Sequence, residues 1–144
     1  MNWRREAEQM LRDYPLRRSA IRGLGQELES LKDRLTAAGS PRMDGGVPRG
    51  ERTVEDAWID SIMRRDKLDT ALRVARAEVR RTERGLGALS EQERHILNAF
   101  YMHRTQDSVD RLMEELHLER SQVYARKDGA LRKFTLAMYG TLEN

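Results

Sequence analysis

The spacing of apolar residues between positions 108 and 134 constrains the fold of this chain more than any other feature. Val109, Leu112, Met113 and Leu116 recur at i, i+3, i+4 and i+7, which places them on one face of a helix. A second set with helical spacing begins shortly afterwards and contains Val123, Ala130, Leu131 and Phe134. The pattern predicts two short amphipathic helices, each with one buried face.

The residues between the two sets predict a tight turn. Asp107 or Ser108 can cap the first helix, and His117, Leu118 and Glu119 form the connection. Leu118 is expected to fill the angle between the helices, and Glu119 to accept hydrogen bonds from the free amides of the second helix. The segment therefore reads as a helix-turn-helix.

The outward face of the second helix has the chemistry to read base edges in double-stranded DNA. Arginine offers a bidentate donor fork, glutamine both donates and accepts, and small side chains permit close approach. Farther along the helix, basic side chains suit contacts to phosphate. The candidate DNA-binding residues are Arg120, Ser121, Gln122, Tyr124, Ala125, Arg126, Lys127, Arg132 and Lys133.

Charge is divided unevenly along the chain. Residues 90–144 hold eight Lys/Arg and nine Asp/Glu, but the acidic residues crowd the first helix of the motif and the basic residues the second. The excess of positive charge lies in the first 89 residues, where Arg76, Arg80 and Arg84 share one helix face. These three arginines could form a solvated face, or a surface that binds phosphate or an acidic partner, and the sequence leaves both interpretations open.

The segment LSEQERHILNAFYMHRTQDSVDRLMEELHLERSQVYARKDGALRKF resembles region 4 of sigma-70 factors, and more closely the ArpU/RinA-type phage transcriptional regulators. The matching positions are Leu89, Ser90 and Glu93 at the start, Ser121, Val123 and Tyr124 at the recognition helix, and Ala130, Leu131, Arg132 and Lys133 at its end. Leu11 to Pro15 and a Gly/Pro-rich linker are similar to the N-terminal half of that family. The resemblance implies a phage or prophage regulator that acts near bacterial RNA polymerase. It also implies that promoter bases are contacted by Arg120, Ser121, Gln122 and Ala125.

Three residues depart from that family pattern. His117 stands where such turns usually have glycine, although histidine tolerates a left-handed backbone better than most residues. Gly129 lies within the recognition helix, where it costs about 1 kcal/mol relative to alanine. Arg126 replaces a position that is often apolar.

The N-terminal part predicts long helices with heptad seams. Pro15 is expected to end a first helix over 3–14, because it lacks an amide hydrogen and its ring clashes with the preceding turn. Residues 39–52 form a linker, with four Gly and two Pro within 39–50. A long helix resumes near Thr53. The seams of the helices before and after the linker are Ile21, Leu24, Leu28, Leu31 and Leu35, and Val54, Trp58, Ser61, Arg65, Leu68, Leu72, Ala75, Val79, Thr82, Leu86 and Leu89.

These two helices predict an antiparallel hairpin, in which Leu28, Leu31 and Leu35 pack against Trp58, Ile62 and Leu68. The second seam is longer than the first can cover. Its remainder, from Leu72 to Leu89, must pack on the N-terminal helix, the C-terminal domain or another chain, and we favour another chain, hence a homo-oligomer and most simply a dimer. Arg65 and Thr82 would then set register or partner number.

The predicted fold is all-α, with a coiled-coil-like hairpin over 1–89 and a sigma-like helix-turn-helix domain over 90–144. The chain has no Cys, and His95, His103 and His117 lack the spacing of metal ligands, so we expect no metal, no cofactor and no enzymatic activity. No apolar run approaches the ~20 residues of a membrane span, and no signal peptide is recognisable, which predicts a cytoplasmic protein without membrane contact.

Two other functions fit the same pattern. A small terminase-like phage packaging protein also joins a helix-turn-helix to coiled-coil helices in an oligomeric ring, although there the DNA-binding unit is usually N-terminal. A helical adaptor could instead bind RNA polymerase without touching bases.

Overall fold

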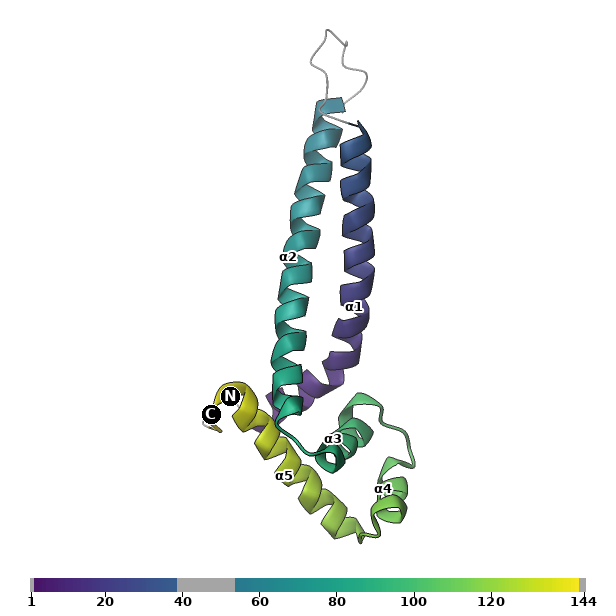
Figure 1. The fold of residues 1–144 in the computed structure, drawn as a ribbon, viewed down its shortest axis with the longest axis vertical. Helices are drawn as coiled ribbons and strands as arrows, with labels where there is room; N and C mark the ends of the chain where they lie inside the picture. The colour runs from purple at the N-terminus through teal and green to yellow at the C-terminus, as the bar shows by residue number, and fades with distance from the viewer. Residues whose placement is uncertain (1, 39–53, 143–144) are drawn as a thin grey trace. The chain divides into compact units, whose positions relative to one another are not determined.

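The computed structural model describes residues 2–38 and 54–142, and every regular element in those residues is a helix (Figure 1). The predicted all-α class is therefore confirmed. The helices are α1 (Trp3–Ala38), α2 (Val54–Gly87), α3 (Glu91–Leu97), a π-helical turn (Asn98–Met102), α4 (Ser108–Leu116) and α5 (Arg120–Tyr139). The predicted linker at 39–52 lies outside the described residues.

The chain divides into two compact units, and the division differs from the predicted boundary at residue 89. One unit comprises Met1–Arg18 together with Ala77–Asn144, and the other comprises Ser19–Arg76. The C-terminal helices therefore share a unit with the first turns of α1 and the last turns of α2. This arrangement was missed because sequence periodicity shows which face of a helix is apolar, and does not show which distant helix covers it.

Helix α1 runs through Pro15 without a break, so the predicted helix end at that residue is wrong. A proline inside a helix removes one backbone hydrogen bond and costs about 3 kcal/mol. Apolar residues on both sides of Pro15 are buried, with Met10 and Leu11 before it and Leu28 and Leu31 after it. Their burial offsets this cost, because each fully buried large apolar side chain contributes roughly 1.5–3 kcal/mol.

In the unit Ser19–Arg76, the segments of α1 and α2 lie side by side (Figure 1). Leu28, Leu31 and Leu72 are buried, and Arg64 of α2 forms an ion pair with Glu27 of α1. The other apolar residues expected in this contact are only half-buried: Leu35, Trp58, Ile62 and Leu68.

The seam from Leu72 to Leu89 is buried within the single chain, so the prediction that it binds another chain is wrong. Leu72, Val79, Leu86 and Leu89 are all buried. Leu86 and Leu89 belong to the same apolar cluster as Ala7, Met10 and Leu11 of α1 and the C-terminal helices. Thr82 is also buried, and its hydroxyl donates to the carbonyl oxygen of Glu78 at 3.0 Å, so it does not face a partner.

Close helix packing in the unit of residues 1–18 and 77–144 depends on Gly85. A Cβ atom at this position would lie 2.7 Å from the ring of Phe134 and 2.8 Å from Cγ of Met138. The absence of a side chain therefore lets the end of α2 approach α5. Two tyrosine hydroxyls complete the packing: Tyr14 donates to Glu83 at 3.0 Å, and Tyr101 donates to Glu8 at 3.3 Å.

Helix α3 begins with a capping box formed by Ser90 and Glu93, which the sequence analysis did not predict. The amide of Glu93 donates to Oγ of Ser90 at 3.2 Å, and the amide of Ser90 donates to the Glu93 carboxylate at 3.0 Å. That backbone hydrogen bond, together with Lys133 beside the carboxylate, lowers the pKa of Glu93.

Candidate nucleic-acid interface

Helices α4 and α5 are joined by the predicted three-residue turn. His117 adopts the left-handed conformation, with φ 55° and ψ 46°, so the histidine occupies the backbone state that glycine usually fills. The amide of Leu118 donates to the carbonyl oxygen of Met113 at 3.1 Å, and Leu118 itself is half-buried. The turn thus has the length and the conformation that the sequence predicts.

The start of α4 differs from the prediction in detail. Asp107 occupies the cap position, but its side chain makes no hydrogen bond to the free amides of the helix. Its carboxylate instead accepts from the hydroxyl of Thr105 at 2.5 Å and from Nε of Arg111 at 3.0 Å. The hydrogen bond from Thr105 lowers the pKa of Asp107. Ser108 accepts from the Thr105 amide at 2.9 Å, so it orders the loop before the helix.

Glu119 and Gln122 stabilise the start of α5 together. The amide of Glu119 donates to Oε1 of Gln122 at 2.9 Å, as in a capping box. Gln122 therefore has a structural task that the sequence analysis missed, and its carbonyl oxygen is already engaged. Its side-chain amide nitrogen has no hydrogen-bond partner among the described residues and is the atom suited to contact a base acceptor.

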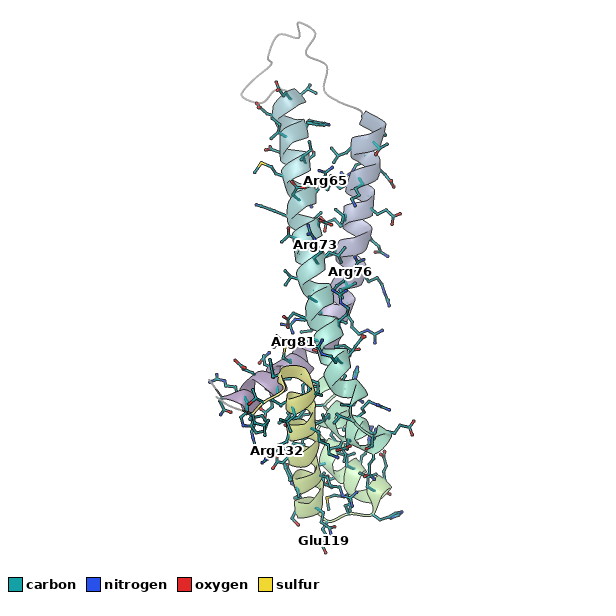
Figure 2. All side chains as sticks on the ribbon, turned by 60° about the vertical axis from the view of Figure 1, so that its left-hand side comes forward. Arg65, Arg73, Arg76, Arg81, Glu119 and Arg132 are labelled. Atoms are coloured by element: carbon teal, nitrogen blue, oxygen red, sulfur yellow. The ribbon has the colours of Figure 1, made fainter. Side chains whose placement is uncertain are left out.

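The buried face of α5 agrees with the predicted one. Val123, Ala130, Leu131 and Phe134 are all buried, and Thr135 and Met138 extend the same face. On the opposite side, the candidate residues Arg120, Ser121, Gln122, Ala125 and Arg126 are exposed. Figure 2 shows Glu119 at the start of α5 and Arg132 farther along the helix.

The exposed cations of α5 are held by weak contacts. Arg120 lies 3.7 Å from the Asp110 carboxylate of α4, and Nη1 of Arg126 donates to Gln92 of α3 at 2.8 Å. Lys133 pairs with Glu93 at 3.0 Å. Arg132 is exposed and makes no ion pair within the described parts of the chain. Exposed ion pairs are worth at most about 1 kcal/mol, so a phosphate could readily compete for these side chains.

Lys127 differs most from its predicted role. Its side chain is only 12% exposed, and Nζ lies 2.9 Å from the Asp128 carboxylate. The ammonium also lies 5.5 Å from the centre of the Phe100 ring and 5.6 Å from that of Tyr124. These two rings pack edge to face at 5.4 Å. Lys127 therefore stabilises an aromatic contact and offers little charge to a phosphate.

Arg104 is a cation that the sequence analysis missed. It follows the π-helical turn, is exposed, and lies 5.7 Å from the Phe100 ring. Only the fold brings it to the same aromatic cluster as Tyr124, because Phe100 links the two segments.

The described residues contain no group of three or more His, Cys, Asp or Glu side chains that could hold a metal ion. His95 pairs with Glu115 at 2.7 Å, and His103 pairs with Asn98 at 2.6 Å. Within residues 2–38 and 54–142, no helix is long and apolar enough to span a membrane.

Comparison with protein-family models, curated proteins and solved structures gives no match to this chain. The resemblance to sigma-70 region 4 and to ArpU/RinA-type regulators therefore remains a prediction from the sequence.

Proposed function

We propose that this chain is a sequence-specific DNA-binding transcription regulator, encoded by a phage or prophage, and that α5 is its recognition helix. The observation that carries the proposal is the two-sided character of α5. One side is buried against the rest of its unit, and the N-terminal turns of the other side expose Arg120, Ser121, Gln122, Ala125 and Arg126. A recognition helix uses its N-terminal residues for bases in the major groove.

The exposed residues divide into readers and positioning contacts. Arg120 and the free amide of Gln122 lie on the first turns, where side chains reach base edges. Arg132 lies farther along the helix, where the DNA backbone would be, and it replaces Lys127 as the best phosphate contact. Arg120 must leave Asp110 to reach DNA, which costs little because both side chains are exposed.

The acidic helix α4 supports a single orientation. Asp110, Glu114 and Glu115 are exposed on it, and this side would be repelled by phosphate. DNA would therefore approach from the outward face of α5. In this proposal the unit Ser19–Arg76 is a coiled-coil-like hairpin that does not read bases, and RNA polymerase is a partner on the strength of the family resemblance alone.

The proposal is tested by DNA affinity across a salt series, on a sequence enriched from a random pool. Arg132→Ala should weaken binding to all sequences and reduce the salt slope by about one unit. Arg34→Ala, which removes an exposed arginine of α1, is the matched control and should change neither quantity.

Gln122 needs a variant that keeps its capping role. Gln122→Glu retains an acceptor for the Glu119 amide but replaces the side-chain amide with a carboxylate, so the fold should survive while specific binding falls at least tenfold. If Gln122→Glu and Arg132→Ala both bind like the parent chain in low salt, α5 is not a recognition helix. If only Arg132→Ala has an effect, the chain holds DNA without reading it, which favours a packaging role.

A further inference from the structure

The start of α1 lies beside α5, within the unit of residues 1–18 and 77–144 (Figure 2). Nη1 of Arg4 in α1 pairs with the Asp128 carboxylate of α5 at 3.3 Å. One helical turn farther along α1, Glu8 accepts a hydrogen bond from the Tyr101 hydroxyl, and Arg12 lies 5.5 Å from the centre of the Tyr101 ring. The first turns of α1 therefore follow one side of the helix that we propose as the recognition helix.

The outward face of α5 has two borders. Tyr124 and Asp128, four residues apart, lie on one border, and Arg126 and Lys133, seven residues apart, lie on the other. A helix with its side chains is about 10–12 Å across, and the major groove is about 12 Å wide, so a helix in the groove fills it. Each border then faces one sugar–phosphate strand, and Arg4, which is paired with Asp128, lies beside one of the two strands.

Arg104 reaches the same border from the loop before α4. Its guanidinium lies 5.7 Å from the centre of the Phe100 ring, and that ring packs edge to face against Tyr124 at 5.4 Å. Arg104 is exposed and forms no ion pair with any residue in 2–38 or 54–142. Two segments outside α5 thus bring arginines to the border of Tyr124 and Asp128.

Cations outnumber carboxylates at this border. The two carboxylates nearby at the start of α4, Asp107 and Asp110, each lie within ion-pair distance of an arginine, Arg111 and Arg120. Arg5 is exposed and shares the face of α1 that carries Arg12, seven residues later. The charged residues of the border are Arg4, Arg5, Glu8, Arg12, Arg104, Lys127 and Asp128.

The opposite border carries no such excess. Arg126 donates to Gln92 of α3 at 2.8 Å, and Lys133 pairs with Glu93 at 3.0 Å. Glu91, at the start of the same helix, is exposed. The two cations of this border are therefore matched by two carboxylates of α3, and the border of Tyr124 and Asp128 offers more positive charge to a phosphate strand.

We infer that Arg4 and Arg104 hold the phosphates of the DNA strand that runs beside Tyr124 and Asp128, so that the start of α1 is part of the DNA-binding surface. The inference rests on the proposed function, because it takes α5 to lie in the major groove. Arg4 and Asp128 have side chains that are 44% and 40% exposed, so their ion pair is weak and exchanges readily for phosphate. Nζ of Lys127 lies 2.9 Å from the same carboxylate and continues to balance its charge when Arg4 turns to DNA.

DNA binding by the full chain across a salt series, on the sequence enriched from a random pool, tests the inference. Arg4→Gln and Arg104→Gln should each weaken binding to all sequences and reduce the salt slope by about one unit, because each removes one phosphate contact. The preference for the enriched sequence should remain, since neither residue contacts a base. Arg4→Lys keeps the positive charge and should keep the parental slope.

Arg18→Gln is the matched control. Arg18 is also an exposed arginine of α1 beside a tyrosine, at 5.7 Å from the centre of the Tyr14 ring, but Tyr14 donates to Glu83 of α2 and does not border α5. Arg18→Gln should change neither the affinity nor the slope. Circular dichroism should show equal helix content in all variants, so that a change in slope reports lost contacts and not unfolding.

Arg132→Ala, on the outward face of α5, separates this inference from the proposed function. If Arg132→Ala reduces the slope while Arg4→Gln and Arg104→Gln leave it unchanged, α5 binds DNA and the inference is wrong. If none of the three variants changes the slope, both the inference and the proposed function are wrong. An equal reduction by Arg18→Gln would show that only the total charge matters, which would also overturn the inference.

Discussion

Two glycines in the unit of residues 1–18 and 77–144 should respond to the same substitution with opposite signs. Gly129 lies within α5, and an added Cβ atom would meet nothing within 4 Å. Gly129→Ala should therefore stabilise the unit by about 0.5–1 kcal/mol, since alanine is the better helix former. Gly85→Ala gains the same helix propensity, but its Cβ atom would lie 2.7 Å from the Phe134 ring. Because Phe134 is fully buried and cannot move aside, overpacking should cost about 1–3 kcal/mol and exceed the gain.

Thermal unfolding, followed by fluorescence, measures both changes. The chain has two tryptophans, of which Trp3 packs against the core of the relevant unit and Trp58 lies in the other unit. In a Trp58→Phe background, the remaining fluorescence reports the unit that contains both glycines. A change of 1 kcal/mol corresponds to roughly 4–8 °C in the melting temperature of a unit of this size. If Gly85→Ala stabilises the unit as much as Gly129→Ala does, the close approach of α2 to α5 is wrong.

Three further substitutions test individual contacts. Lys127→Ala should lower the melting temperature and leave the salt slope of DNA binding unchanged, because the ammonium packs against Phe100 and Tyr124. A reduced salt slope would instead show that Lys127 contacts phosphate. Burial and the nearby Glu8 raise the pKa of Tyr101 above 10.0, so the folded state loses stability as the pH rises above about 10. Between about pH 8 and about pH 11, the Tyr101→Phe variant should therefore lose less stability than the parent chain, as measured by urea midpoints. The pKa of Glu93 is lowered, so its contribution to stability is present above about pH 4.5 and lost in acid. Glu93→Ala should therefore destabilise the chain at pH 7 and have little effect near pH 3. An equal effect at both pH values would contradict the capping box.

Local features of the C-terminal helices were predictable from the sequence. The buried face of α5 and the turn at His117 each depend on residues within a few positions of one another. Helical periodicity acts over the same range, so one sequence is enough to locate them.

The misplaced features depend on contacts between distant segments. Pro15 is tolerated because residues on both sides of it are buried, and the seam from Leu72 to Leu89 is covered within the chain. Lys127 is largely buried because its ammonium packs against Phe100, which lies on another helical segment. The periodicity and charge of these positions do not show which distant residues they contact, and those contacts determine whether each side chain is buried.

The central claim is that the outward face of α5 reads DNA sequence, and selection from a random pool of double-stranded DNA tests it most directly. The full chain should enrich one motif, and it should bind that motif roughly a thousandfold or more tightly than unselected DNA at physiological salt. Gln122→Glu should lose that preference while retaining weak binding to any sequence. A pool that stays random after repeated selection by the folded chain would contradict the claim.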